Sequence, residues 1–182
     1  MTGGGSRARI PFRAVNRPGS PDHDPGLQRH HLLPCALLRR RAFARMLGAI
    51  DREALGFEDF RCNGLLLPAS GAAARRLGLP LHRGPHRQYN GMVAERVGQI
   101  EARWAARSPR EPDLAGEEAL FRLALLQRSL RRRLLDPPGR PLRLNRSDPL
   151  GTGFDFTELD AMAETLWGAT HSTLAASSSF AA

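Results

Sequence analysis

The sequence of 182 residues lacks any apolar run that approaches the ~20 residues needed to cross a membrane. Its mean hydropathy is -0.37. Its N-terminus, MTGGGSRARIPFRAV, carries charge but lacks the apolar stretch of ~7–15 residues found in secretory signals. We therefore expect a cytoplasmic protein without a membrane partner, although export by another route stays open.

Cysteine is nearly absent, since only Cys35 and Cys62 occur and they form no Cys-x-x-Cys motif. Two cysteines in this arrangement exclude a disulfide framework. We expect both to be small side chains buried in the core, as free cysteines usually are.

Lysine is missing altogether, so all 27 basic side chains are arginines, against 18 acidic ones. The net charge of +9 and the pI of about 11.4 favour a polyanionic partner, because neutralising phosphates releases counterions. A GC-rich genome would produce the same bias towards Arg, Ala, Gly and Pro. The charge therefore supports a nucleic-acid partner without establishing one.

The hydrophobic fraction of 41% is enough for a real core, and the patterning predicts an α+β chain that is mostly helical. Short apolar stretches predict strands at residues 27–33 and 65–67. Four stretches with helical spacing predict helices at residues 35–50, from Pro85 to about residue 107, from a cap at Asp113 to Leu135, and at about residues 156–167.

Four of the six histidines form two pairs, His30-His31 and His82 with His86. A spacing of four on a helix would place His82 and His86 on one face, close enough to share a metal. If Pro85 is the first helical residue, His82 lies just before the helix and approaches the site from the preceding turn. Neighbours on a strand point to opposite faces, so one of His30 and His31 can bind metal while the other faces a substrate. A catalytic metal commonly has about three protein ligands and an open position.

His82 and His86 with one of the adjacent pair would supply three ligands; if His30 is the third, His31 is left as a neutral imidazole suited to act as the general base. The spacing equally allows the two neighbours to exchange roles. The amide of Asn63 is suited to fix a loop carbonyl that orients the His31 ring. On spacing alone, however, Asn63 with Gly64 is first of all a tight turn.

Three stretches of the chain together resemble a known family: RHHLLP at residues 29–34, NGLLLP at 63–68 and HRGPHRQYN at 82–90. They are similar to the AHH nucleases of the HNH/endonuclease VII superfamily, over about residues 27–104. Arg29 stands where the family usually has Ala or Gly. The resemblance implies metal ligands at His30, His82 and His86, a general base at His31, and a central asparagine at Asn63.

The same resemblance implies a ββα-metal (HNH-like) core, with a two-stranded hairpin and a helix around one divalent metal ion, which could be Zn, Mg, Mn or Ni. We expect a C-terminal helical extension to follow this core. The predicted segments are a flexible basic N-terminal arm at 1–26, the nuclease core at 27–107, the helical extension at 108–170 and a disordered tail at 171–182.

The expected function is metal-dependent hydrolysis of phosphodiester bonds in nucleic acid, with DNA favoured over RNA. Arg29, Arg83 and Arg87 flank the histidines, and we expect them to bind nucleic acid. Many members of the family that the chain resembles are toxin modules, but a toxin role does not follow for this chain; an immunity or inhibitor protein is a further partner that the resemblance allows.

Two alternatives remain open on the sequence alone. The first is a non-catalytic nucleic-acid binder with a structural metal, held by Cys35, Cys62, His82 and His86. The second is a hydrolase that acts on small phosphoesters, in which the basic surface has no part in binding the substrate.

Overall fold

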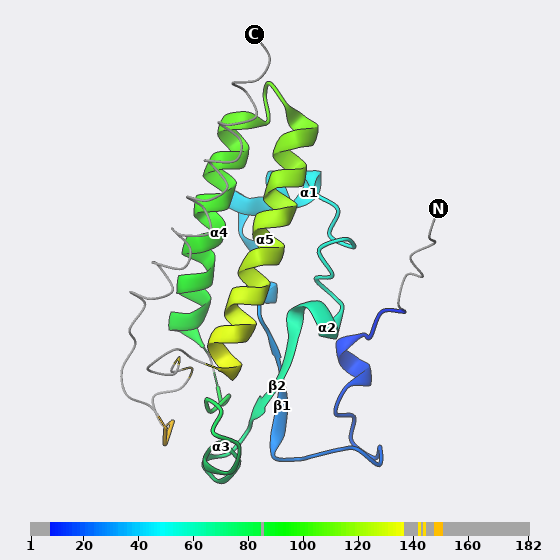
Figure 1. Cartoon of the computed structure of the whole chain (residues 1–182), viewed down its shortest axis with the longest axis vertical. Helices are drawn as coiled ribbons and strands as arrows, with labels where there is room; N and C mark the ends of the chain where they lie inside the picture. The colour runs from blue at the N-terminus through cyan, green and yellow to red at the C-terminus, as the bar shows by residue number, and fades with distance from the viewer. Residues whose placement is uncertain (1–7, 85, 137–141, 143, 145–147, 151–182) are drawn as a thin grey trace.

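The computed structural model describes residues 8–84, 86–136, 142, 144 and 148–150 (Figure 1). The fold is α+β and mostly helical, with one sheet of two strands among these residues. The elements run in the order η1 (Phe12–Ala14), β1 (Leu27–His31), η2 (Cys35–Arg39), η3 (Arg41–Phe43), α1 (Ala44–Ala49), α2 (Phe60–Asn63), β2 (Gly64–Pro68), α3 (Gly71–Leu77), α4 (Arg87–Arg107) and α5 (Pro112–Leu135).

The two strands pair antiparallel, with Leu27 opposite Pro68 and His31 opposite Gly64. Both predicted strands are therefore confirmed, although β1 ends two residues before Leu33. Alternation along β1 buries His30 and leaves His31 half-buried. The register of this pair thus decides which histidine faces the interior.

Gly64 marks the point where α2 passes directly into β2, so Asn63-Gly64 forms a junction between elements rather than an isolated turn. A Cβ atom at Gly64 would lie 2.2 Å from Cδ2 of Phe60. Any other side chain would displace the Phe60 ring, so the glycine allows this ring to lie against the backbone of the junction.

The helix predicted at residues 35–50 is wrong as a single element, because the chain forms η2, η3 and α1 there. The break lies at Arg40, whose backbone is extended. Leu37 and Phe43 are both buried, yet six residues of continuous α-helix would place them on different faces. The extended residue turns both side chains into the same core.

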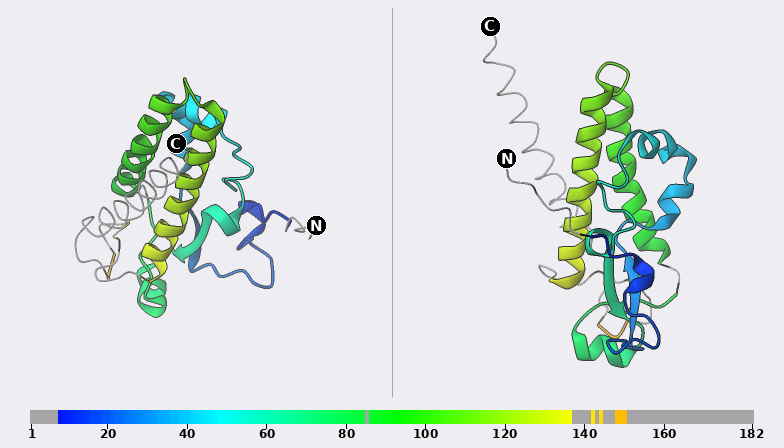
Figure 2. Two further views of the ribbon diagram at one scale, coloured as in Figure 1. Left: turned by 45° about the horizontal axis from the view of Figure 1, so that its top comes forward. Right: turned by 90° about the vertical axis from the view of Figure 1, so that its right-hand side faces the viewer.

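The helices α4 and α5 pack side by side along their length, and the strand pair lies at the end where α4 begins and α5 ends (Figures 1 and 2). Both were predicted, but their starts differ from prediction. α4 begins at Arg87, and Pro85 lies outside the described residues. α5 begins at Pro112, so Asp113 lies in its first turn and does not cap it.

One hydrophobic core joins the sheet to this helix pair. It includes Val97 and Ile100 of α4 and Leu123 and Leu130 of α5, as the helical spacing predicted. None of the helices described by the structure combines the length and apolar character needed to span a bilayer.

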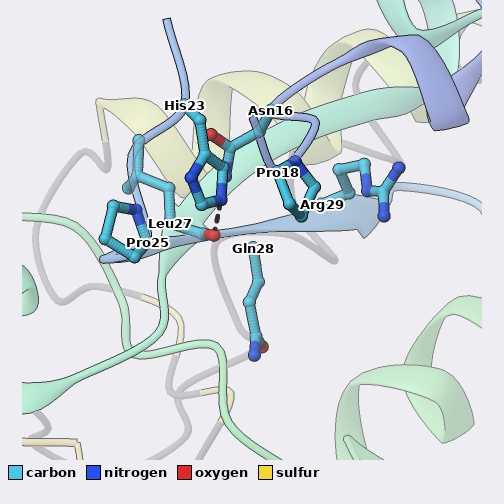
Figure 3. Close-up of a pocket in the computed structure, with 7 residues that line it drawn as sticks. All are labelled: Asn16, Pro18, His23, Pro25, Leu27, Gln28 and Arg29. Atoms are coloured by element: carbon cyan, nitrogen blue, oxygen red, sulfur yellow. Dashed lines mark hydrogen bonds between the residues drawn. The ribbon is translucent and has the colours of Figure 1, made fainter. Parts of the chain in front are cut away.

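The N-terminal segment of the described chain is tied to the sheet. The Nδ2 atom of Asn16 donates to the carbonyl oxygen of Leu27 at 2.9 Å (Figure 3). The same atom donates to Asp24 O at 2.9 Å, and Oδ1 of Asn16 accepts from Asp24 N at 2.8 Å. Beside it lies a hollow of about 480 Å³ lined by Asn16, Pro18, His23, Pro25, Leu27, Gln28 and Arg29.

Several predictions concern residues outside the described range: the helix at 156–167, the tail at 171–182 and the first seven residues of the arm. The division of the chain into four segments stays a prediction. Helix α3 was not predicted, although Ser70 gives a signal for it. The Ser70 side chain caps this helix by accepting from Ala73 N at 3.2 Å.

Candidate metal centre

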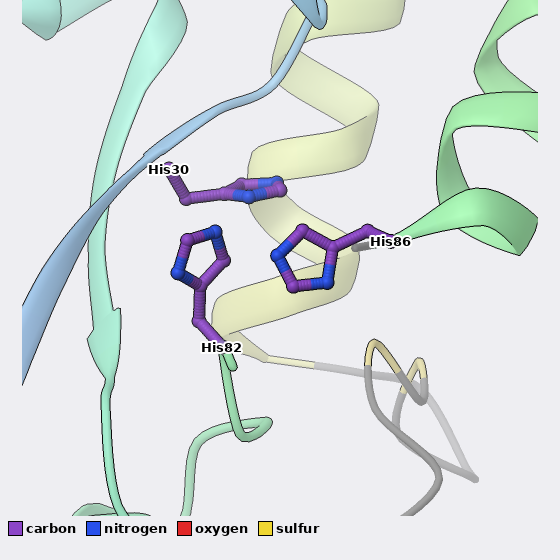
Figure 4. A group of neighbouring side chains, drawn as sticks. All are labelled: His30, His82 and His86. Carbon is purple, nitrogen blue, oxygen red and sulfur yellow. The ribbon is translucent and has the colours of Figure 1, made fainter. Parts of the chain in front are cut away.

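Three histidines from three separate segments come together at the end of the sheet. His30 lies on β1, His82 in the loop after α3, and His86 is the N-cap residue of α4. Their rings face a common space (Figure 4), and the potential ligand atoms lie within 4.8 Å of one another. The ring centroids of His82 and His86 are 4.3 Å apart, and that of His30 lies 4.9 Å from His82.

The predicted helical spacing does not explain this arrangement, because neither His82 nor His86 lies within α4. Gly84, between them, has a φ of +78°, which other residues rarely adopt. The two rings therefore meet through a turn in the loop and not through one helix face.

His30 is only 3% exposed. Its buried Nε2 atom has no hydrogen-bond partner among the residues that the structure describes. A buried polar atom without a partner is rare in folded proteins and calls for an explanation. Two further imidazoles beside this atom give a donor set that suits a divalent metal, so the residues present fit such an ion.

The other ring nitrogens of the two loop histidines face oxygen acceptors. The Nδ1 atom of His82 lies 3.3 Å from Oε1 of Gln28, and that of His86 lies 3.2 Å from the carbonyl oxygen of Leu144. The carbonyl oxygen of Leu144 can only accept, so in this contact Nδ1 of His86 carries the proton and Nε2 keeps its lone pair. Oε1 of Gln28 favours the same tautomer at His82. Metal-binding histidines are commonly oriented in this way.

The electrostatics favour neutral rings at His30 and His82. Burial lowers the pKa of His30 well below its usual value, and the neighbouring His82 and His86 lower it further. Burial, followed by the charge of His86, lowers the pKa of His82 to about 4. Neutral imidazoles keep the lone pairs that metal binding requires.

His31 lies on the other face of β1. Its ring stacks on that of Phe12, with centroids 3.7 Å apart and planes 5° from parallel. Burial lowers the pKa of His31, while Glu58 opposes this effect and Arg29 adds to it. The His31 ring is therefore held in a defined position outside the group of three.

Phe12 was not identified from the sequence, where it is a single aromatic residue in an apparently irregular arm. Its carbonyl oxygen accepts from Nη1 of Arg29 at 2.9 Å. The rings of Phe12 and Phe60 pack edge to face, with their centroids 5.2 Å apart. The backbone N–H of Phe60 also donates to Ile10 O at 2.8 Å. The segment before the sheet is thus fastened beside His31.

Asn63 is fully buried and makes three side-chain hydrogen bonds to the backbone. Its Oδ1 accepts from Leu33 N at 2.7 Å, and its Nδ2 donates to Leu33 O at 3.1 Å and to Phe57 O at 3.0 Å. The amide therefore fixes a loop carbonyl, that of Leu33, two residues after His31. Tyr89 adds to this clamp by donating its hydroxyl to Leu32 O at 2.7 Å.

The three arginines predicted to bind nucleic acid are all exposed. Arg29 follows Gln28 on β1, Arg83 follows His82, and Arg87 is the first residue of α4. They belong to the segments that carry the histidines, but they take no part in the group of three itself.

The cysteines are not placed as predicted, because Cys35 and Cys62 are both exposed. Each lies in a short helical piece near the surface, η2 for Cys35 and α2 for Cys62. Within the described ranges, the group able to hold a metal contains three histidines and no cysteine. A closed site of two cysteines with His82 and His86 is therefore not what the chain forms.

Comparison with curated proteins and with solved structures yields no significant match. A family model, by contrast, matches residues 12–130, which is more than half of the chain. The matched range contains all four histidines of the two pairs, Asn63 and the stacking residue Phe12. The chain belongs to AHH, a nuclease family of the HNH/ENDO VII superfamily with conserved AHH.

Proposed function

We propose that this protein is a metal-dependent endonuclease that hydrolyses phosphodiester bonds of nucleic acid, DNA in preference to RNA. The observation that carries the proposal is the convergence of His30, His82 and His86, with the buried Nε2 of His30 lacking a hydrogen-bond partner in the described chain. Membership of a nuclease family supplies the expected substrate.

His30, His82 and His86 would hold one divalent ion in a ββα-metal core. A bound ion supplies positive charge beside the scissile phosphate, where it offsets the negative charge that builds in the transition state. Three imidazoles suit Zn or Ni by their softness. Mg and Mn remain candidates, because water and phosphate oxygens can complete their coordination.

His31 would act as the general base. As a neutral imidazole it takes a proton from a water molecule while the water oxygen forms a bond to phosphorus. The bond between phosphorus and the leaving oxygen of the sugar breaks, and that oxygen acquires a proton from solvent. The position of His31 outside the group of three supports this role, as does the depressed pKa that keeps the ring unprotonated.

Arg29, Arg83 and Arg87 would contact phosphates on either side of the cleaved bond. All three are exposed and lie next to the segments that carry the site. Their contribution should be independent of sequence and should weaken as salt rises. An immunity or inhibitor protein that covers this surface remains part of the proposal.

The test is cleavage of plasmid DNA and of RNA by the purified chain, with a series of Mg²⁺, Mn²⁺, Zn²⁺ and Ni²⁺ and with a chelator. We expect cleavage only with a divalent ion. His30→Ala should abolish both metal binding and cleavage, whereas His23→Ala should retain both, because His23 lies outside the group. Cleavage by protein shown to be free of metal would refute the proposal. If small phosphoesters are cleaved and nucleic acid is not, the protein is a small-phosphoester hydrolase and not an endonuclease.

A further inference from the structure

Asp148 lies beyond the range matched by the family model, yet it contacts the loop that carries His82. Its Oδ2 accepts from the backbone N–H of Leu81 at 2.9 Å, and its Oδ1 accepts from Leu150 N at 3.0 Å. Both Asp148 and Leu81 are buried. The next N–H along the chain, that of His82, donates to Pro68 O at 2.7 Å. Two consecutive N–H groups thus fix His82, one to the end of β2 and the other to Asp148.

Leu144, also beyond the matched range, contacts the second loop histidine. Its carbonyl oxygen lies 3.2 Å from Nδ1 of His86. A carbonyl oxygen can only accept, so Nδ1 of His86 must carry the proton in this contact. The lone pair then resides on Nε2. One backbone carbonyl thereby selects the tautomer and the orientation of the ring.

Such support is needed because His82 and His86 both precede the first turn of α4. His82 lies in a loop, and His86 joins the helix only through its carbonyl oxygen, which accepts from Asn90 N at 2.8 Å, whereas His30 lies within β1. In metal sites, groups that hydrogen-bond to the ligands set their geometry and contribute to affinity.

We propose that Asp148 and the carbonyl group of Leu144 are positioning groups for the metal centre, so that these two residues beyond α5 complete a site whose ligands all lie before that helix. This inference rests on the proposed metal-dependent function. It assigns a role in that function to a part of the chain that the family match does not reach.

The first experiment examines the full-length wild-type protein without metal. We expect slow hydrogen exchange at the Leu81 amide. We also expect nitrogen chemical shifts showing that His86 is protonated on Nδ1, the tautomer that the Leu144 contact requires. Fast exchange at Leu81, or an Nε2-protonated His86, would overturn the proposal whether or not any variant folds.

The second experiment compares the full-length variants Asp148→Asn and Asp22→Asn by calorimetric titration with Zn²⁺ and with Mn²⁺. Both substitutions remove one negative charge, but Asp22 is exposed. We expect Asp148→Asn to bind metal roughly tenfold more weakly and Asp22→Asn to match the wild type. Excess metal should restore cleavage by Asp148→Asn, because the ligands themselves are intact.

The outcomes separate this inference from the function on which it rests. A wild-type protein that binds neither of these metals, nor Mg²⁺ or Ni²⁺ in the same titration, would refute the metal centre and the proposed function with it. Equal affinity in the wild type and in folded Asp148→Asn would refute the positioning role alone and leave the nuclease proposal standing.

Discussion

Replacing Asn63 by Ala tests whether the buried amide holds the chain that follows β1. The substitution removes three side-chain hydrogen bonds and leaves the N–H and carbonyl of Leu33 and the carbonyl of Phe57 without their partner. Each buried backbone group left unsatisfied costs ~1–3 kcal/mol. Because Asn63 is 0% exposed, water cannot take the place of the amide without a rearrangement.

Three such groups at the lower end of that range predict a loss of about 3 kcal/mol in the free energy of unfolding. For a chain of this size, that loss lowers Tm by roughly 10 °C. The assay is urea unfolding followed by circular dichroism. The slope of the unfolding free energy against urea concentration should be equal in the wild type and in Asn63→Ala, which shows that both expose the same surface on unfolding.

Asn16 provides a matched control, since its side chain also makes three hydrogen bonds to the backbone but is only partly buried. Its φ of +48° makes glycine the appropriate replacement, because alanine would add strain. We expect Asn16→Gly to lower the free energy of unfolding clearly less than Asn63→Ala does. A loss below about 1 kcal/mol for Asn63→Ala, or equal losses for the two variants, would refute the reasoning.

Three further predictions follow from the site. His31→Ala should lower the cleavage rate by ~10²–10⁴ with unchanged metal affinity, measured by single-turnover cleavage and calorimetry; loss of the metal instead would make His31 a ligand. Metal-free protein should lose stability as pH falls from about 6.5 towards 4. In this range His30 and His82 bind protons in the unfolded chain but stay neutral in the folded one, because their pKa values are lowered there. Melting in chelator across this pH range measures the effect, and a Tm that rises on acidification would contradict it. Phe12→Leu should lower kcat about three- to tenfold and leave metal affinity alone, since an aromatic pair contributes ~0.5–1.5 kcal/mol. Phe12→Tyr should keep the wild-type kcat, because it retains the stacked ring. Identical kcat values for Phe12→Leu and Phe12→Tyr would show that the stacked ring does not affect turnover.

The sequence was sufficient to single out His30, His82 and His86, which the fold brings together, because histidine is rare in this chain. The roles of these residues, of His31 and of Asn63 stay predictions. The sequence also predicted β1, β2 and the two long helices, whose apolar residues follow the periods of strand and helix. The helix predicted at residues 35–50 failed because residues with near-helical spacing can also be presented by short helical pieces joined at an extended residue, here Arg40.

The support around the site could not be predicted, because it depends on contacts between residues far apart in the chain. Gln28 and His82 are 54 positions apart, and Leu81 and Asp148 are 67 apart. No local pattern signals such pairs. Phe12 belongs to the same class, since its importance depends on the arm folding back over His31.

The roles of the two adjacent histidines depend on the register of the sheet. A slip of β1 by one residue would exchange the faces of His30 and His31 and would also shift Leu32 and Leu33, which follow the strand and are buried in the core. Hydrogen bonds to Asn63 oppose that slip from the end of β1, since its carbonyl oxygen accepts from Leu32 N at 2.8 Å and its side chain holds Leu33. Burial in the core and the hydrogen bonds of the Asn63 amide therefore both stabilise the observed register of the two strands. Together they support the assignment of His30 as the metal ligand and of His31 as the base.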